Sequence, residues 1–286
     1  MNWQNIPRDD KTIKRAILPK RGALSEFDFS QIEPRIFGYF CMTGLKDDTI
    51  IQVYADGRDI YREIAARTYA VPYDTITAHQ RQIAGKIGFL ATLYGAGPKA
   101  LHEQIGITLA EAKELYNAIH EGWPQLRLLS NPPPRSFRAD YQPGLVERIL
   151  KQRGYIKTPY GRHLHVEKFG GHKMLNKLIQ GTAADLMKEA LRKVDRAIGI
   201  DATVIPGVFT DNTVGSLPLA SRMVTSIHDS IGLDGPVEEL ATLHDLIPDL
   251  MRSKWLTDVI PVEVDHEVST TSWADMVDYD EWLEAA

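Results

Sequence analysis

Cysteine is almost absent from this 286-residue sequence. Cys41 is the only one, so no disulfide can form within the chain, and a reducing, cytoplasmic setting fits best. The chain also lacks any apolar run of about 18 residues or more, so we expect no membrane span. No secretion signal precedes the first predicted element. No glycine-rich phosphate loop follows a strand, which counts against a Rossmann or P-loop fold.

Charge of one sign is missing from two stretches of the chain. The net charge is −5, and residues 258–286 carry nine acids and no Lys or Arg. Residues 148–177 are the reverse, because only Glu167 opposes a run of basic residues: Arg148, Lys151, Arg153, Lys157, Arg162, Lys168, Lys173 and Lys177. A local basic surface of this kind can bind phosphate despite the acidic total. The alternative interpretation is an ordinary solvated face.

Strand patterns occupy both ends of the sequence, and helical patterns fill the middle. We predict strands at 23–29, 223–233 (a hairpin) and 260–268, a smaller hairpin at 155–166, helices at 30–40, 59–69, 77–93, 109–120 and 172–198, and a loop at 131–134. This order predicts a sheet-based domain interrupted by a helical insertion. The expected parts are residues 1–52, 53–172 and 173–286, with the insertion in the middle.

Two aspartates end or join the predicted strands. Asp28 follows an apolar strand, where a buried carboxylate needs a compensating charge such as a hard divalent cation. On spacing alone, Ser30 and Glu33 after it favour a helix capping box. Asp229 follows His228 at the tip of the second hairpin, where an aspartate is commonly only a turn former. Apolar flanks on both sides of the His228–Asp229 pair weaken that interpretation.

Two predicted helices carry polar side chains at helical spacing. Lys86, Leu90 and Tyr94 stand four residues apart, so one face presents a cation, an apolar group and an aromatic ring. The alternative is a core face with an extended lysine. Asn176 and Gln180 share a face of the later helix, where they would suit the edge of a base pair. Ordinary helix packing is the alternative there.

Taken together and in order, these segments resemble the polymerase region of family A DNA polymerases, the bacterial DNA polymerase I type. The resemblance runs from residue 2 to about residue 273. It is carried by Asn2 to Pro7, Asp28 to Arg35 (motif A), Arg81 to Gly95 (motif B), Gly154 to Thr158 with Gly161 and Arg162, Gln180 to Asp185, His228-Asp229 (motif C), and Pro261 to Val264 with Trp273.

The resemblance implies an α+β, right-hand polymerase fold, with an antiparallel-sheet palm (1–52 and 173–286) interrupted by helical fingers (53–172). It implies a DNA-directed DNA polymerase (EC 2.7.7.7) that adds deoxynucleotides to a primer 3′-OH. Asp28, Asp229 and the Phe29 carbonyl would hold two Mg²⁺ ions, with Mn²⁺ as an alternative, and Lys86 would join Asp28 and Asp229 in catalysis.

Further site residues follow from the same resemblance. Residues matching the family's nucleotide-binding positions are Gln31, Glu33, Tyr61, Arg81, Gln82, Lys86, Leu90 and Tyr94. Glu33 would pack under the sugar and exclude a 2′-hydroxyl, which overturns the plain capping interpretation. Residues matching DNA-binding positions are Arg35, Gly95, Arg162, Asn176, Gln180 and His228.

The chain also departs from the family pattern. Motif B has Gln82 where the family has arginine, with Arg81 one place earlier, and Tyr61 stands in place of a phosphate-contacting histidine. Leu90 replaces an aromatic residue, and His172 replaces a helical arginine. Motif C usually continues to Glu, where this chain has Ser230. We expect these changes to lower efficiency without removing a metal carboxylate.

No thumb or exonuclease segment is recognisable in the sequence. We therefore expect a minimal or split, phage-type polymerase, with a separate thumb- or exonuclease-bearing chain or another replication protein as a partner beside primer–template DNA and dNTPs. The setting would be a bacterial or phage-infected cell. The alternative function is a catalytically weak DNA-binding subunit of a split polymerase. A metal-dependent nuclease is a third interpretation, but no additional acid cluster supports it.

Overall fold

Strands from the two ends of the chain meet in one sheet. The computed structural model describes residues 11–130, 144–165, 173–198 and 219–285. It divides into two units: the first comprises Met1–Ile32, Ala184–Thr257 and Val262–Ala286, and the second Glu33–Ala183 and Asp258–Pro261. These units do not test the predicted assignment of residues 1–52, 53–172 and 173–286 to palm and fingers, which stays a prediction.

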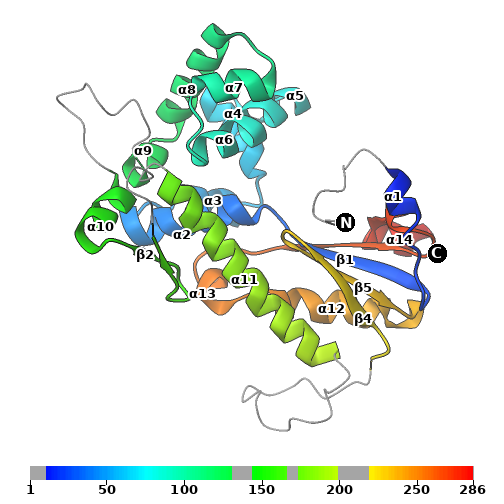
Figure 1. Cartoon of the computed structure of the whole chain (residues 1–286). Helices are drawn as coiled ribbons and strands as arrows, with labels where there is room; N and C mark the ends of the chain where they lie inside the picture. The colour runs from blue at the N-terminus through cyan, green and yellow to red at the C-terminus, as the bar shows by residue number, and fades with distance from the viewer. Residues whose placement is uncertain (1–10, 131–143, 166–172, 199–218, 286) are drawn as a thin grey trace, which may run out of the picture. The chain divides into compact units, whose positions relative to one another are not determined.

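The first unit is built on a five-stranded sheet in the order β4-β5-β1-β6-β7, and all its neighbouring pairs are antiparallel (Figure 1). Its strands are β1 (Ala23–Phe29), β4 (Arg222–Ile227), β5 (Ser230–Gly235), β6 (Val264–Ser269) and β7 (Val277–Asp278). The central strand β1 is flanked on both edges, and most of its residues are buried. Register places Asp28 opposite Ser230 of β5 and Asp265 of β6.

Helices cover one face of this sheet. The unit contains α1 (Lys11–Arg15), α12 (Leu240–Met251), α13 (Lys254–Thr257), α14 (Tyr279–Ala285) and the short turns η5 (Val237–Glu239) and η6 (Trp273–Asp275). Phe27 is fully buried and stacks on His266, with ring centroids 4.0 Å apart. His244 of α12 places its Nδ1 3.1 Å from Nδ1 of His266, and Tyr279 of α14 stacks on both imidazoles. Aromatic stacking therefore fixes these helices on the sheet.

The second unit is mainly helical. Its elements are α2 (Ile32–Leu45), α3 (Thr49–Ala55), α4 (Ile60–Tyr69), η2 (Tyr73–Thr75), α5 (Ala78–Gln80), η3 (Arg81–Gly88), α6 (Phe89–Leu93), α7 (Pro98–Ile105), α8 (Leu109–Gly122), α9 (Gln125–Leu129), α10 (Leu145–Arg153), the hairpin β2 (Ile156–Lys157) and β3 (His163–Leu164), and the first part of α11 (Met174–Ile198). Its core includes Phe37, Phe89 and Trp123, which pack edge to face. None of the helices in the described ranges is long and apolar enough to cross a membrane.

The predicted helix at 77–93 forms, but not as one regular α-helix. A capping box between Thr77 and Gln80 begins it, and η3 in its middle is a π-helix. Gly85 lies in η3 against α4, where an added Cβ would overlap the Tyr61 carbonyl oxygen. Only glycine permits this approach of two backbones. π-helical turns are rare and occur often at functional sites.

The remaining predicted elements are present with small shifts of their ends. The strand at 23–29, both hairpins and the helices at 30–40, 59–69, 109–120 and 172–198 all have counterparts in the structure, and the α+β fold with an antiparallel sheet is confirmed. The predicted loop at 131–134 lies outside the described residues, as do the motif at 2–7 and His172.

Candidate functional site

Asp28 and Asp229, here called the acid pair, lie side by side on the sheet of the first unit. Asp28 is the penultimate residue of β1, and Asp229 is in the two-residue turn between β4 and β5. His228 begins that turn with φ of 53°, a left-handed value that tight hairpin turns require. The Phe29 N–H donates to the Asp229 carbonyl at 3.2 Å. This bond ties the turn to the end of β1.

The carboxyl groups of the acid pair are hydrogen-bonded to each other. Burial, followed by the charges of Asp229 and Glu26, raises the pKa of Asp28 to about 8, and the hydrogen bond with Asp229 and the charge of Asp265 contribute to this rise. Burial also raises the pKa of Asp229, while bonds from its own backbone and from Asp28 oppose that rise. Two close carboxylates resist ionising together. Without a cation, the pair therefore retains a proton at neutral pH.

The donor set of the acid pair fits a hard divalent cation. Carboxylate oxygens are the preferred ligands of Mg²⁺, which keeps several waters and needs only one or two protein carboxylates. A cation would also remove the repulsion that raises the pKa of Asp28. Within the described ranges, no group of three or more His, Cys, Asp or Glu side chains is placed to hold a metal ion. The pair itself, with water and substrate oxygens, is the arrangement that fits.

A third acidic side chain near the pair was not predicted from the sequence. Glu26 precedes Asp28 by two residues, and alternate residues of a strand share a face. Its charge raises the pKa of both Asp28 and Asp229. The alternation of side chains between the two faces of β1 is the sequence signal that places Glu26 on the same face as Asp28.

The second unit gathers cations around the rings of Tyr61, Tyr73 and Trp123. This basic cluster consists of Arg58, Arg62, Arg67, Arg81 and Lys86. Arg81 forms two bonds to Asp59, from Nε at 3.0 Å and from Nη2 at 2.7 Å, and these bonds raise the pKa of its guanidinium. Both Arg81 and Lys86 lie near the Tyr61 ring, at 5.4 and 5.9 Å from its centroid. Three predicted nucleotide-binding residues are thus brought together.

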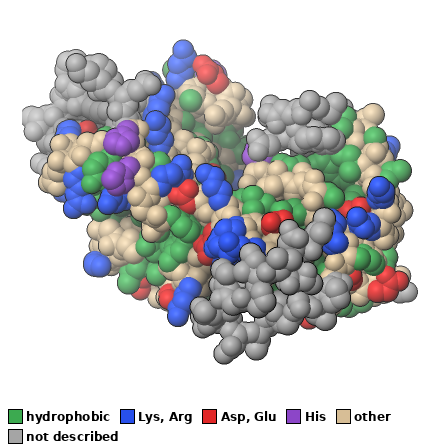
Figure 2. All heavy atoms as spheres, turned by 60° about the horizontal axis from the view of Figure 1, so that its bottom comes forward, with side chains coloured by type: hydrophobic (Ala, Val, Ile, Leu, Met, Phe, Trp, Pro, Cys, Tyr) green, Lys and Arg blue, Asp and Glu red, His purple; other side chains and the backbone are tan. Residues whose placement is uncertain are grey.

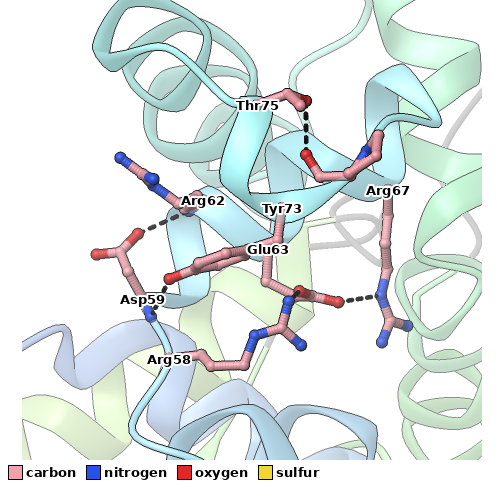
Figure 3. Close-up of polar contacts among 8 residues, drawn as sticks. Arg58, Asp59, Arg62, Glu63, Arg67, Tyr73 and Thr75 are labelled. Atoms are coloured by element: carbon pink, nitrogen blue, oxygen red, sulfur yellow. Dashed lines mark hydrogen bonds and ion pairs between the residues drawn. The ribbon is translucent and has the colours of Figure 1, made fainter.

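Glu63 neutralises two other members of the basic cluster. It accepts from Arg58 at 2.6 Å and from Arg67 at 2.8 Å (Figure 3). Arg62 extends away from Glu63 in the same view, and its guanidinium lies 5.5 Å from the Tyr73 ring. Among the residues that the structure describes, Arg62 and Lys86 form no ion pair. No described carboxylate therefore neutralises these two cations.

Glu33 and Tyr94 meet within the second unit. The Tyr94 hydroxyl donates to the Glu33 carboxylate, and Gln180 also bonds to Tyr94. Burial, followed by the bond to Glu33, raises the pKa of Tyr94 well above its ordinary value. Three predicted site residues from α2, α6 and α11 therefore form one hydrogen-bonded group. Their spacing in the sequence did not predict this group.

The other predicted residues are more dispersed. Arg162 donates from Nη2 to the Gly181 carbonyl at 2.6 Å, one residue from Gln180. Gln82 is exposed, Leu90 is half-buried, Gly95 has φ of 84° after α6, and Gln31 has φ of 53° before α2. Asn176 has a buried Oδ1 without a described hydrogen-bond partner.

Arg35, a predicted DNA-contacting residue, is buried within the second unit. It is only 1% exposed, its guanidinium lies 4.0 Å from the Tyr54 ring centroid, and Nη1 donates to the Pro261 carbonyl. An enclosed cation of this kind serves packing inside the unit. Its position gives no support to the predicted contact with DNA.

The predicted basic surface is described only in part, because Lys168 falls outside the described residues. In the hairpin, Tyr155 stacks on His163 with centroids 4.1 Å apart, and Lys157 lies 5.8 Å from the Tyr155 ring. Basic and histidine side chains gather on one part of the face drawn in Figure 2. Tyr155 is half-buried in this group, and aromatic rings among cations can stack with unpaired bases.

Comparisons with known proteins identify relatives of this chain. The family model described as DNA polymerase family A matches residues 1–275. The chain is 28% identical over 279 residues to DNA polymerase I of Geobacillus stearothermophilus and 27% identical over 279 residues to that of Bacillus subtilis (strain 168). Each match covers 96% of this chain and 29% of the relative.

A solved structure is similar as well. It is the POL domain of Pol1 from M. smegmatis in complex with a DNA primer–template and dNTP, and it superposes with a TM-score of 0.71 at 26% identity. The match covers 96% of this chain and 45% of that one. All three relatives are bacterial, and the expected phage source finds no support among them.

Proposed function

The chain belongs to DNA polymerase family A, and on this premise we propose that it is a template-directed DNA polymerase that adds deoxynucleotides to a primer 3′-OH. It spans 29% of the length of the curated relatives compared above, so their activity is a proposal for this chain. The observation that carries the proposal is the acid pair. Two carboxylates about 200 residues apart in sequence are held on one sheet with raised pKa values.

The proposed reaction joins the primer 3′-oxygen to the α-phosphorus of the nucleotide, breaks the bond to pyrophosphate and releases the 3′-hydroxyl proton. Two Mg²⁺ ions, or Mn²⁺, bound by Asp28, Asp229 and the Phe29 carbonyl would stabilise charge on the attacking and leaving oxygens. The chain's own contribution is to hold both carboxylates at the ends of neighbouring strands, where Asp28 would give up its proton on binding a cation.

Lys86 is the proposed partner of the incoming triphosphate. It lies in η3 without an ion pair among the described residues, so its charge is available to phosphate oxygens. Arg81 is the weaker candidate, because Asp59 already occupies its guanidinium. The other proposed nucleotide contacts are Gln31, Tyr61, Gln82 and Leu90.

Glu33 and Tyr94 are proposed to select the sugar. A carboxylate fixed by a tyrosine hydroxyl has little freedom to move aside for a 2′-hydroxyl, the group that separates RNA from DNA precursors. Tyr94 and Gly95 would also stand near the templating base. The proposed product is therefore DNA.

Residues of the second unit and of the β4–β5 turn are proposed to contact primer–template DNA. They are Gly95, Arg162, Asn176, Gln180 and His228. Gln180 and Asn176 share a face of α11, where their amides would read base-independent acceptors in the minor groove. A separate thumb- or exonuclease-bearing partner stays a prediction.

Primer extension with Mg²⁺ and dNTPs tests the proposal. We expect Asp28→Ala and Asp229→Ala each to lower the extension rate by about a thousandfold or more, which is ~4 kcal/mol of transition-state stabilisation. Asp278→Ala, an exposed acid on β7, is the matched control and should keep the wild-type rate. Equal rates in all four proteins would reject the acid pair as the catalytic site.

The same proteins separate the alternative function from the proposed one. Fluorescence anisotropy of a labelled primer–template measures binding without catalysis. If the wild-type chain binds DNA as tightly as the variants but extends no primer, the DNA-binding subunit replaces the polymerase as the better description. Extension by the wild type alone contradicts that alternative.

A further inference from the structure

Glu26 faces the same side of the sheet as the acid pair. It lies two residues before Asp28 on β1, and register pairs it with Gly232 of β5 and Glu267 of β6. Gly232 has no side chain beside Glu26, and an added Cβ there would overlap the Thr225 side chain on β4. The neighbouring strand therefore leaves room for the Glu26 carboxylate next to the turn that carries Asp229.

Two neutral donors fix the Glu26 carboxylate. The Ser230 hydroxyl lies 2.8 Å from Oε1, and the Trp273 indole N–H donates to Oε2 at 2.6 Å. The Ser230 hydroxyl is also 3.0 Å from the Ile227 carbonyl, but a carboxylate is the stronger acceptor. No Lys, Arg or His among the described residues forms an ion pair with Glu26. Its orientation is set, and its charge is not neutralised.

Ser230 links this carboxylate to the acid pair. It follows Asp229 directly, is buried, and pairs across the strands with Asp28. A cavity of about 220 Å³ borders Glu26 and Trp273, so water can reach the carboxylate. Motif C, which His228-Asp229 resembles, usually continues to Glu where this chain has Ser230. Glu26 thus brings a carboxylate from β1 to the hydroxyl that occupies that position on β5.

We propose that Glu26 is a positioning residue of the acid pair, and that its charge, held through Ser230, strengthens the binding of divalent cations by Asp28 and Asp229. This inference rests on the proposed function, because it assigns Glu26 to the same metal centre. A carboxylate beside two others adds attraction for a cation without contacting it directly. We expect the loss of its charge to weaken cation binding about tenfold.

Mn²⁺ binding to the whole chain tests the proposal without catalysis. Free Mn²⁺ is measured by electron paramagnetic resonance in the wild type, Glu26→Gln and Asp28→Ala, together with thermal unfolding as a check of folding. Glu26→Gln keeps the size of the side chain and removes its charge. We expect its Kd for Mn²⁺ to rise about tenfold, with no change in Tm. In primer extension, the Mg²⁺ concentration for half-maximal rate should rise in parallel, with the rate at saturating Mg²⁺ largely kept.

A carboxylate exchange between the strands gives the sharper result. Glu26→Ala alone should weaken Mn²⁺ binding, and the double variant Glu26→Ala with Ser230→Glu should restore the Kd to within about threefold of the wild type, because Ser230 lies at the other end of the same hydrogen bond. Glu267→Gln is the matched control. It removes a carboxylate at the same register on β6 and should shift the Kd by about twofold or less.

The outcomes separate this inference from the proposed function. An unchanged Kd in Glu26→Gln, or an equal shift in Glu267→Gln, would overturn the role of Glu26 while Asp28→Ala still abolishes binding. Tight Mn²⁺ binding that survives Asp28→Ala would instead reject the metal centre itself. Failure of Ser230→Glu to rescue a folded Glu26→Ala protein would also count against the proposal.

Discussion

The acid pair of the first unit and the basic cluster of the second carry opposite charges and balance them differently. Asp28 and Asp229 face each other with Glu26 and Asp265 nearby, and their repulsion appears as raised pKa values. In the basic cluster, Glu63 pairs with Arg58 and Arg67, and Asp59 pairs with Arg81. One region therefore retains the repulsion between its carboxylates, whereas the other has already neutralised most of its charge internally.

This difference predicts unequal sensitivity to substitution. No other described carboxylate takes the place of Asp28 or Asp229. We therefore expect the largest loss of extension rate when either member of the acid pair is removed. Removing one cation from the basic cluster should have a graded effect that depends on whether that cation has a partner. Four further predictions follow this order, from larger effects to smaller ones.

Lys86 and Arg81 should differ although both belong to the basic cluster. We expect Lys86→Met to raise the KM for dNTPs by about 10- to 100-fold, because it removes a cation without an internal partner. Arg81→Met should raise KM by about threefold or less, since Asp59 already holds that side chain. Steady-state primer extension measures both. Equal increases would show that the ion pair with Asp59 opens during binding.

Glu33 and Tyr94 test whether the hydrogen bond between them matters for the sugar. Glu33→Ala should raise the ratio of ribonucleotide to deoxynucleotide incorporation by about tenfold, the discrimination that one well-placed contact provides. Tyr94→Phe keeps the Glu33 carboxylate but removes the hydroxyl that holds it in place. This variant should therefore raise the same ratio by a smaller factor. Single-nucleotide incorporation gives the ratio. An unchanged ratio in Glu33→Ala would return Glu33 to a helix-capping role.

The acid pair should make stability depend on pH and on Mg²⁺. The folded pKa of Asp28, about 8, lies above its ordinary value of 3.8, so the metal-free fold loses stability as pH rises from about 4 to 8. At pH 8, Mg²⁺ should raise the Tm of the wild type by a few degrees, roughly 1 kcal/mol, and leave Asp28→Asn unchanged. Metal-free Asp28→Asn should be the more stable protein. Thermal unfolding with and without EDTA measures this, and an equal Mg²⁺ effect in both proteins would contradict it.

His266 should give the smallest effect and the opposite pH dependence. Burial, followed by the charge of His244, lowers the pKa of His266 to about 3. Its neutral form therefore contributes stability above about pH 6.5 that is lost as pH falls toward 3. Relative to the wild type, His266→Phe should gain about 0.7 kcal/mol between pH 7 and pH 6. Urea denaturation at both pH values measures the difference, and a constant difference would rule out titration of this imidazole.

The strands were predictable because local patterns determine them, as in residues 23–29 and the short apolar segments around His228 and Asp229. Those patterns left each aspartate with an ordinary structural interpretation, and only the resemblance to family A polymerases implied that Asp28 and Asp229 meet on neighbouring strands. The family-ordered motifs between them then indicated the fold. The comparisons confirm the family and the α+β architecture, while the roles of the individual site residues stay predictions.

Tertiary contacts explain what the sequence did not predict. The π-helical η3 packs against α4 through the close approach of Gly85 to Tyr61, two residues that no short window of the sequence contains. The ion pair of Arg81 with Asp59 joins residues 22 positions apart, and the bond of Tyr94 to Glu33 joins residues 61 apart. Arg35 matched a DNA-contacting position in sequence, but its neighbours Tyr54 and Pro261 enclose it.

The contact between Gly85 and the Tyr61 carbonyl also affects how a mutational scan of this chain would be interpreted. Any side chain at residue 85 would wedge α4 away from η3, the helix that carries Lys86. A screen that records only activity would therefore score Gly85 alongside the acid pair, although glycine has no group to offer a substrate. Folded yield, measured for each variant beside its rate, separates this packing requirement from chemistry.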